Sequence, residues 1–176
     1  MLLAHVRAAL LGSLAALALF VVAGLPIYVF PQVDEPAKVD VIYVLGLATE
    51  TRMALADGML EAGLSETLMI STPDPEEDPL CEPRSDVRVY CLTPEPFTTQ
   101  GEAQDLATMA ADHDWNSALV ITFTPHIDRA RMLIKRCYTG ELRVVEDDAA
   151  ISIGYWGYQY LYQTGAFIKA ALTPGC

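Results

Sequence analysis

The sequence predicts an α/β domain, with a mostly parallel sheet flanked by helices, behind one transmembrane helix. Two patterns lead to this prediction. The chain starts with a long apolar run, and the rest alternates between short β-rich apolar runs and helical stretches, which is typical of parallel sheets. The part behind the apolar run, about 140 residues long, is a normal size for one domain with one core.

The apolar run extends from Ala8 to Phe30 and holds no Asp, Glu, Lys or Arg. As a helix it would be roughly 34 Å long, enough for a hydrocarbon core of about 30 Å. Arg7 precedes the run and Asp34 follows it, so the positive-inside rule places the N-terminus in the cytoplasm. A cleaved signal peptide is the alternative. The run exceeds a usual h-region, however, and no A-x-A site stands directly before Gln32.

This organisation gives an anchor over residues 1–30, a proline-rich linker over 31–37 and an extracytoplasmic domain over 38–176 at the cell membrane. The net charge of −12 disfavours nucleic acid and anionic lipid headgroups as bulk partners. We therefore expect the membrane contact to be made by the anchor, and no nucleic-acid partner.

Cysteine usage supports export, because all four cysteines follow the apolar run and an even number fits the disulfides of an oxidising compartment. Four cysteines allow three pairings. Pairing of neighbours along the chain needs the least rearrangement. A zinc site is not expected, since the chain has no C-x-x-C and its exported histidines have no ligand spacing to cysteine. The favoured pairs are Cys81 with Cys91 and Cys137 with Cys176.

Expected strands cover 39–45, 67–71, 87–92, 118–123 and 142–145, and expected helices cover 50–62, 98–112, 125–137 and 163–172. Gly63 follows the first of these helices in the usual C′ position. Residues 72–85 form a loop that is long for a strand-to-helix connection. The aromatic segment 155–167 is expected to pack in the core or at a sheet edge, with a ligand surface and the membrane interface as the alternatives.

Ligands of open parallel sheets bind beyond the carboxyl ends of the strands. Three polar stretches are expected to meet there, residues 46–52, 98–103 and 124–129. They supply the candidate site residues. The ligand-binding candidates are Gly46, Arg52, Thr99, Thr124 and Arg129, and the catalytic candidates are His126 and Glu102.

The basic residues carry the functional interpretation of these stretches. Arg52 and His126 lie in the first turns of expected helices, where a positive charge opposes the macrodipole, and Arg129 shares a helix face with His126. A phosphate or carboxylate, also held by backbone N–H groups, would complete such a site. The helix start would lower the pKa of His126 and keep it neutral as a general base, with Glu102 as its partner.

A purely structural interpretation exists for the same residues. Thr99 and Glu102 have the spacing of a capping box, and Thr124 with Pro125 reads as an N-cap followed by proline at N1. The chain carries no G-x-G-x-x-G, Walker, G-x-S-x-G or paired-cysteine motif. We therefore expect no cofactor.

Over most of 39–145 the chain resembles the YdcF/SanA/ElyC-type domain family of bacterial envelopes. The likeness rests on DVIYVLG at 40–46, Arg52, TQGEA at 99–103 and TPHIDRAR at 124–131. It implies a Rossmann-like three-layer fold, a membrane anchor and a role in envelope integrity or in cell-wall and lipid-carrier metabolism. The chain departs from many members, which have T-x-E-N-A at 99–103 and glycine-rich turns after the first two strands.

These observations lead to one hypothesis and one alternative. The hypothesis is an envelope protein whose pocket binds an anionic group, such as that of a phosphorylated precursor or lipid-linked glycan, with hydrolysis or transfer as the reactions open to it. The alternative is a non-catalytic anchored binding or scaffold module. There the same residues would be helix caps, and the aromatic segment would dock a partner.

Overall fold

A computed structural model describes residues 1–176, apart from the side chain of Leu2. Its five strands form one sheet in the order β3-β2-β1-β4-β5, and every neighbouring pair is parallel. This is the Rossmann strand order, so the predicted fold class is confirmed. The strands are β1 (Val41–Val44), β2 (Thr67–Ser71), β3 (Arg88–Leu92), β4 (Ser117–Thr122) and β5 (Glu141–Glu146).

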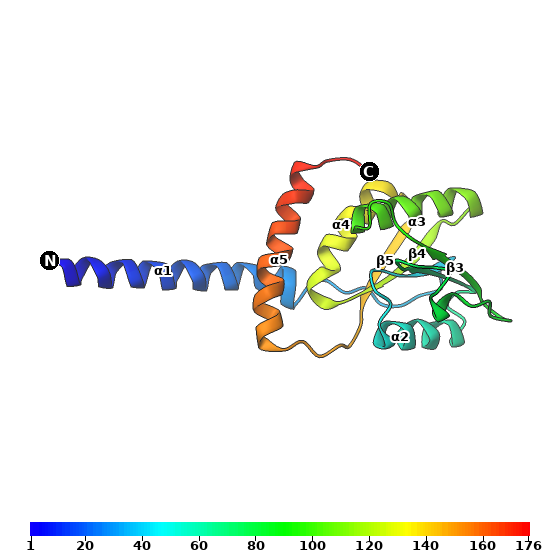
Figure 1. The fold of residues 1–176 in the computed structure, drawn as a ribbon, viewed down its shortest axis with the longest axis horizontal. Coiled ribbons are helices and arrows are strands. Elements are labelled where there is room, and N and C mark those ends of the chain that lie inside the picture. The colour runs from blue at the N-terminus through cyan, green and yellow to red at the C-terminus, as the bar shows by residue number, and fades with distance from the viewer.

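Helices cover both faces of the sheet, as Figure 1 shows. The helices α3 (Thr99–His113) and α4 (Ile127–Cys137) pack on one face, and α2 (Glu50–Glu61) packs on the other. Successive residues of β1 alternate between the two core clusters, with Tyr43 on the α3/α4 side and Ile42 on the α2 side. Burial on both faces explains why the strand reads as a continuous apolar run.

The N-terminal helix α1 (Leu2–Gly24) continues into the π-helical turn η1 (Leu25–Val29) and projects away from the sheet (Figure 1). Residues Leu3–Val29 form a helical stretch that is long and apolar enough to cross a membrane. Its side chains are almost all exposed along this length, which distinguishes it from the core helix of a globular domain.

The segment over residues 31–37 is fixed against the domain. The backbone of Asp34 donates to the Val144 carbonyl over 3.0 Å, and its carboxylate accepts from the Val144 N–H over 2.8 Å and from Arg131. These bonds run along β5, the edge strand of the sheet, and satisfy backbone groups that an open edge would expose. The segment predicted as a linker therefore joins α1 to the domain through specific contacts.

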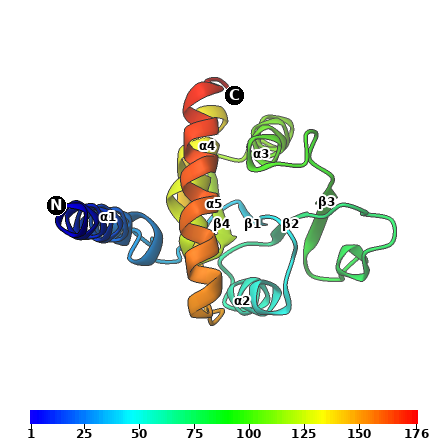
Figure 2. The same ribbon diagram turned by 60° about the vertical axis from the view of Figure 1, so that its left-hand side comes forward.

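The last helix, α5 (Ile153–Leu172), is twice as long as the expected helix over 163–172 and contains the aromatic segment. Figures 1 and 2 both show it running across the end of α1, between α1 and the sheet. Of the two predicted environments, core packing holds for Tyr160, which is 8% exposed, whereas the segment lies on a helix and not at a sheet edge. Aromatic residues favour strands when judged by propensity alone, and packing against α1 and α4 overrides that preference here.

Both predicted disulfides are present, which confirms the pairing by sequence neighbourhood. Cys81 and Cys91 attach the short helix η2 (Pro79–Cys81), and with it the long loop after β2, to β3. Cys137 and Cys176 attach the chain end behind α5 to the last residue of α4. The second bridge therefore holds α5 in place beside the sheet.

Candidate functional site

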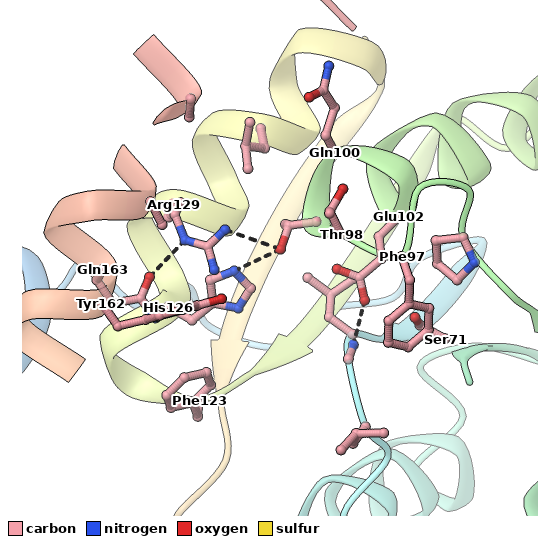
Figure 3. Close-up of a pocket in the computed structure, with 18 of the residues that line it drawn as sticks. Ser71, Phe97, Thr98, Gln100, Glu102, Phe123, His126, Arg129, Tyr162 and Gln163 are labelled. Carbon is pink, nitrogen blue, oxygen red and sulfur yellow. Dashed lines mark hydrogen bonds between the residues drawn. The ribbon is translucent and has the colours of Figure 1, made fainter. Parts of the chain in front are cut away.

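A cavity of about 640 Å³ lies where the carboxyl ends of β1 and β4 meet α5. The strand order reverses between these two strands, and this switch point is where doubly wound sheets bind ligands. Six of the seven sequence-predicted site residues line the cavity (Figure 3). They are Gly46, Arg52, Thr99, Glu102, His126 and Arg129.

Thr124, the seventh candidate, does not line the cavity. It starts the 3₁₀ helix η3 (Thr124–His126), whose N-cap is Phe123 and which has no side-chain cap bond. With three residues per turn, Phe123 and His126 share one face and both line the cavity, whereas Thr124 points elsewhere. The N-cap predicted at Thr124 is therefore wrong as well.

The start of α3 also differs from the prediction, because Thr98 is the N-cap. Its Oγ1 accepts from the Gly101 N–H over 3.3 Å, so Thr99 and Glu102 do not form a capping box. The first turn packs tightly on the preceding loop, since a Cβ on Gly101 would lie 2.1 Å from the Pro96 carbonyl oxygen. As Thr98 satisfies the helix end, Thr99 and Glu102 are free to face the cavity.

Glu102 is only 4% exposed and is held by the backbone of Gly46, whose N–H donates to Oε1 over 2.5 Å. Gly46 has a φ of +63°, a left-handed conformation that glycine adopts without strain and that aims the N–H into the cavity. Burial raises the pKa of Glu102, and the Gly46 bond and the charge of Arg129 partly oppose the shift. Burial thus makes this carboxyl easier to protonate than a carboxyl in water.

His126 is buried and bonded through both ring nitrogens. Nδ1 lies 2.9 Å from Thr122 Oγ1, and Nε2 lies 3.2 Å from Thr99 Oγ1. Burial, followed by the charges of Arg129 and Arg52, pushes its pKa well below 6.5. The predicted direction is confirmed, with burial rather than the helix start as the main cause. Glu102 is not its hydrogen-bond partner, because the hydroxyls of the two threonines occupy both ring nitrogens.

Arg52 has an internal counterion. Its Nε donates to the buried carboxylate of Asp147 over 2.7 Å, and Nη1 donates to the Leu45 carbonyl over 2.8 Å. The guanidinium also lies 5.3 Å from the centre of the Phe123 ring. Asp147 thus supplies the negative charge that the sequence interpretation assigned to a ligand, and the pair ties the end of β5 to the first turn of α2.

Arg129 lines the same cavity with neutral partners. Nε donates to Gln163 Oε1 over 2.7 Å, and Nη1 lies 3.4 Å from Thr99 Oγ1 (Figure 3). Gln163 is fully buried and is itself held by Gln159 over 3.0 Å. Among the described side chains, no carboxylate forms an ion pair with Arg129. Burial lowers its pKa from 12.5, which leaves it charged at any physiological pH.

Sequence reasoning missed several residues of this site. Asp147 and Ser71 directly follow or end their strands, so a search for polar residues at strand ends would have found them. The Ser71 hydroxyl is buried and lies close enough to Glu102 to oppose the rise of its pKa. The residues from α5 left no such signal, because the first half of this helix was not predicted and the predicted second half did not indicate which face meets the cavity. They are Tyr155, Tyr158, Gln159, Tyr162, Gln163 and Lys169.

Comparison with protein-family models, with curated proteins and with solved structures finds no match to this chain. The resemblance to the YdcF/SanA/ElyC-type family stays a prediction from the motifs in the sequence. The geometry of the cavity therefore carries the functional argument.

Proposed function

We propose that this chain is a membrane-anchored envelope protein whose extracytoplasmic pocket binds the anionic group of a phosphorylated envelope precursor or lipid-linked glycan. An anchor is supported by the length and exposure of α1, and an oxidising compartment by the two disulfides. The pocket lies at the switch point of a Rossmann-like sheet, and its volume is that of a small-molecule site.

Arg129 is the observation that carries this proposal. A largely buried guanidinium without a counterion is costly unless a charge is brought to it. Gln163 and Thr99 fix its position with neutral oxygens, and no described carboxylate forms an ion pair with it, although the charge of the nearby Glu102 acts on it. Phosphate and carboxylate are the anions that a guanidinium fork recognises, and a phosphate is the one proposed here.

The rest of the lining fits a phosphate attached to a ring or chain. Lys169 offers a second cation at the cavity, and no described carboxylate pairs with it. Three tyrosines of α5 lie in a stacked row, with ring centroids 5.8 Å apart between Tyr155 and Tyr158 and 5.7 Å apart between Tyr158 and Tyr162. Such aromatic faces bind sugar rings and isoprenyl chains through their apolar surface.

Hydrolysis or transfer is the second candidate, and the raised pKa of Glu102 favours it. A protonated carboxyl facing an anion site can donate a proton to a leaving oxygen. His126 argues for binding without catalysis, because two threonine hydroxyls already engage its ring. The binding function is therefore the main proposal, and chemistry is a property to be tested on Glu102.

The binding test uses the full chain in lipid nanodiscs, titrated with inorganic pyrophosphate, glucose 1-phosphate and farnesyl phosphate. Arg129→Gln should weaken the binding of every phosphate probe that binds. The matched control is Lys135→Gln, which removes the same charge from an exposed position of the same helix. Equal affinity in wild type and Arg129→Gln would remove the proposed anion site.

The catalytic test measures release of inorganic phosphate from glucose 1-phosphate and farnesyl phosphate. If the second candidate holds, Glu102→Gln abolishes turnover while pyrophosphate still binds. Turnover that is the same in wild type and Glu102→Gln, or absent from wild type, assigns the pocket to binding alone. His126→Ala reports in the same assay whether the buried ring takes part.

A further inference from the structure

The outer face of α5 is apolar and exposed. Leu161, Ile168 and Leu172 are 71%, 57% and 77% exposed and lie in one stripe, which also contains the exposed glycines 157 and 165. The opposite side of the helix packs on α4 through buried residues such as Gln163 and Ala170. Charged residues make up 19% of the chain, yet Lys169 is the sole charged side chain of this 20-residue helix.

The neighbouring face of α5 packs against the end of α1. The Tyr160 hydroxyl donates to the Val21 carbonyl over 3.1 Å, and its ring lies 5.9 Å from that of Phe20. Tyr28 joins the contact through a hydroxyl pair with Thr164 at 3.0 Å. A Cβ on Gly24 would lie 2.4 Å from the Tyr160 ring, so the glycine permits the close approach of the two helices.

The contact between α5 and α1 lies near the depth at which α1 would leave the hydrocarbon core of a membrane. A span of about 20 residues crosses a hydrocarbon core, so a span that starts at Ala8, behind Arg7, reaches the far surface near Ile27. The contacts of α5 with α1 and η1, from Phe20 and Val21 to Tyr28, cover the outer end of such a span. Figures 1 and 2 show α5 lying across α1 here, with the sheet on the other side of α5.

We propose that α5 is an interfacial helix, whose stripe of Leu161, Ile168 and Leu172 lies in the headgroup and acyl boundary of the membrane that α1 spans. A helix with an apolar outer face and tyrosines on its flanks has the composition of helices that lie in this plane. The lipid surface is the occupant because α1 delivers α5 to it. This inference rests on the proposed anchoring of α1.

The position of α5 determines which class of ligand can reach the cavity. Tyr155, Tyr158, Tyr162 and Lys169 line the cavity from the flank of the helix that borders the stripe. The mouth of the cavity therefore opens at the level of the lipid headgroups. A phosphate carried by a membrane lipid can reach Arg129 from that side without leaving the bilayer, which favours lipid-linked phosphates over free sugar phosphates.

The experiment measures the depth of nitroxide labels in the full chain, reconstituted into vesicles of phosphatidylethanolamine and phosphatidylglycerol. Single labels are placed on Leu161→Cys, Ile168→Cys and Leu10→Cys. The water-exposed control is Asp112→Cys, at an exposed position of α3. The four native cysteines are in disulfides and stay unlabelled. Relaxation by oxygen is compared with relaxation by a water-soluble nickel chelate.

We expect the labels at 161 and 168 to be several-fold more accessible to oxygen than to the chelate, as at position 10, and the label at 112 to show the reverse. If position 10 is buried in lipid while 161 and 168 behave like 112, α5 is not interfacial and the anchor stands. If position 10 is water-accessible, the proposed anchoring itself fails. Dipolar coupling between labels at 161 in two copies would assign the stripe to a dimer and overturn the lipid contact.

Discussion

Arg52 and Arg129 occupy equivalent places in the molecule, yet their surroundings are opposite. Each lies in the first turn of a helix behind one of the two central strands, and each lines the same cavity. Arg52 is neutralised by the buried carboxylate of Asp147, whereas Arg129 is held by the neutral oxygens of Gln163 and Thr99. The two arginines therefore differ in whether a carboxylate pairs with the guanidinium, and not in their position in the fold.

This difference shows how a structural arginine can be told from a ligand-binding one. A buried guanidinium that already has its carboxylate gains little from a second anion and loses much if the pair breaks. A guanidinium positioned only by neutral groups still gains favourable electrostatic free energy when an anionic ligand binds beside it. We therefore assign Arg52 to the stability of the switch point, and the proposed ligand contact falls to Arg129.

The largest expected effect is the loss of stability in Asp147→Asn. This change leaves Arg52 buried without a counterion and should lower the free energy of unfolding by about 3 to 5 kcal/mol. Urea unfolding of the detergent-solubilised chain measures it. The double variant Arg52→Met with Asp147→Leu should recover most of the loss. Equal destabilisation by Arg129→Gln would break the distinction between the two arginines.

A smaller effect concerns pH, because Glu102 and His126 titrate within the field of Arg129. Burial raises the pKa of Glu102, so stability from its protonated form is full below its ordinary pKa of 4.5 and is lost as pH rises through the folded pKa. Burial lowers the pKa of His126, so stability is lost as pH falls below 6.5. The two groups therefore change the unfolding free energy with opposite sign in the pH range where both titrate.

Single variants should separate these slopes. In His126→Gln the unfolding free energy should fall with rising pH above 4.5, and in Glu102→Gln it should rise with pH up to 6.5. Each slope is at most about 1.4 kcal/mol per pH unit. Urea midpoints measured from pH 4 to 8 provide the test, and identical pH profiles in both variants would contradict the assigned shifts.

The next effect is expected from substitutions in the first turn of α3, which positions Thr99 beside Arg129. Thr98→Ala removes the observed N-cap and should cost about 1 kcal/mol of stability. Thr99→Ala removes no cap and should instead loosen Arg129 and His126, with a larger effect on pyrophosphate affinity than on the urea midpoint. A larger stability loss in Thr99→Ala than in Thr98→Ala would instead support the interpretation of Thr99 and Glu102 as a capping box.

The smallest effect is expected at Lys169, the exposed second cation of the cavity. Exposed charges contribute about 0.2 to 1 kcal/mol, so Lys169→Gln should weaken pyrophosphate binding by about fivefold at most. The loss should shrink at high salt, because exposed charges are screened. A loss that exceeds that of Arg129→Gln would move the main anion contact from Arg129 to Lys169.

The fold was largely predictable because its signals are local. The bounds of β2, the end of α2 before Gly63 and the pairing of the cysteines all follow from neighbouring residues. Most of the site was predictable as well, since parallel strands bring their carboxyl ends together. The first half of α5 was not predicted, because the burial of its face is set by α1 and α4 rather than by its own sequence.

The partners of the charges were not predictable. Asp147 lies 95 residues from Arg52, and Gln163 lies 34 residues from Arg129. Sequence spacing identified two unexplained positive charges but held no information on which of them the fold itself would neutralise. The choice of Thr98 over Thr99 as the N-cap similarly depended on the contact between Gly101 and the Pro96 carbonyl.

The most direct test of the assignment is arginine footprinting of the full chain in nanodiscs with phenylglyoxal, read by mass spectrometry. Without ligand, Arg129 should be modified and Arg52 should be protected by Asp147. Pyrophosphate should protect Arg129 and leave Arg52 and the solvent-facing arginines unchanged. Modification of Arg129 that is the same with and without pyrophosphate, while the probe is bound, would contradict the account.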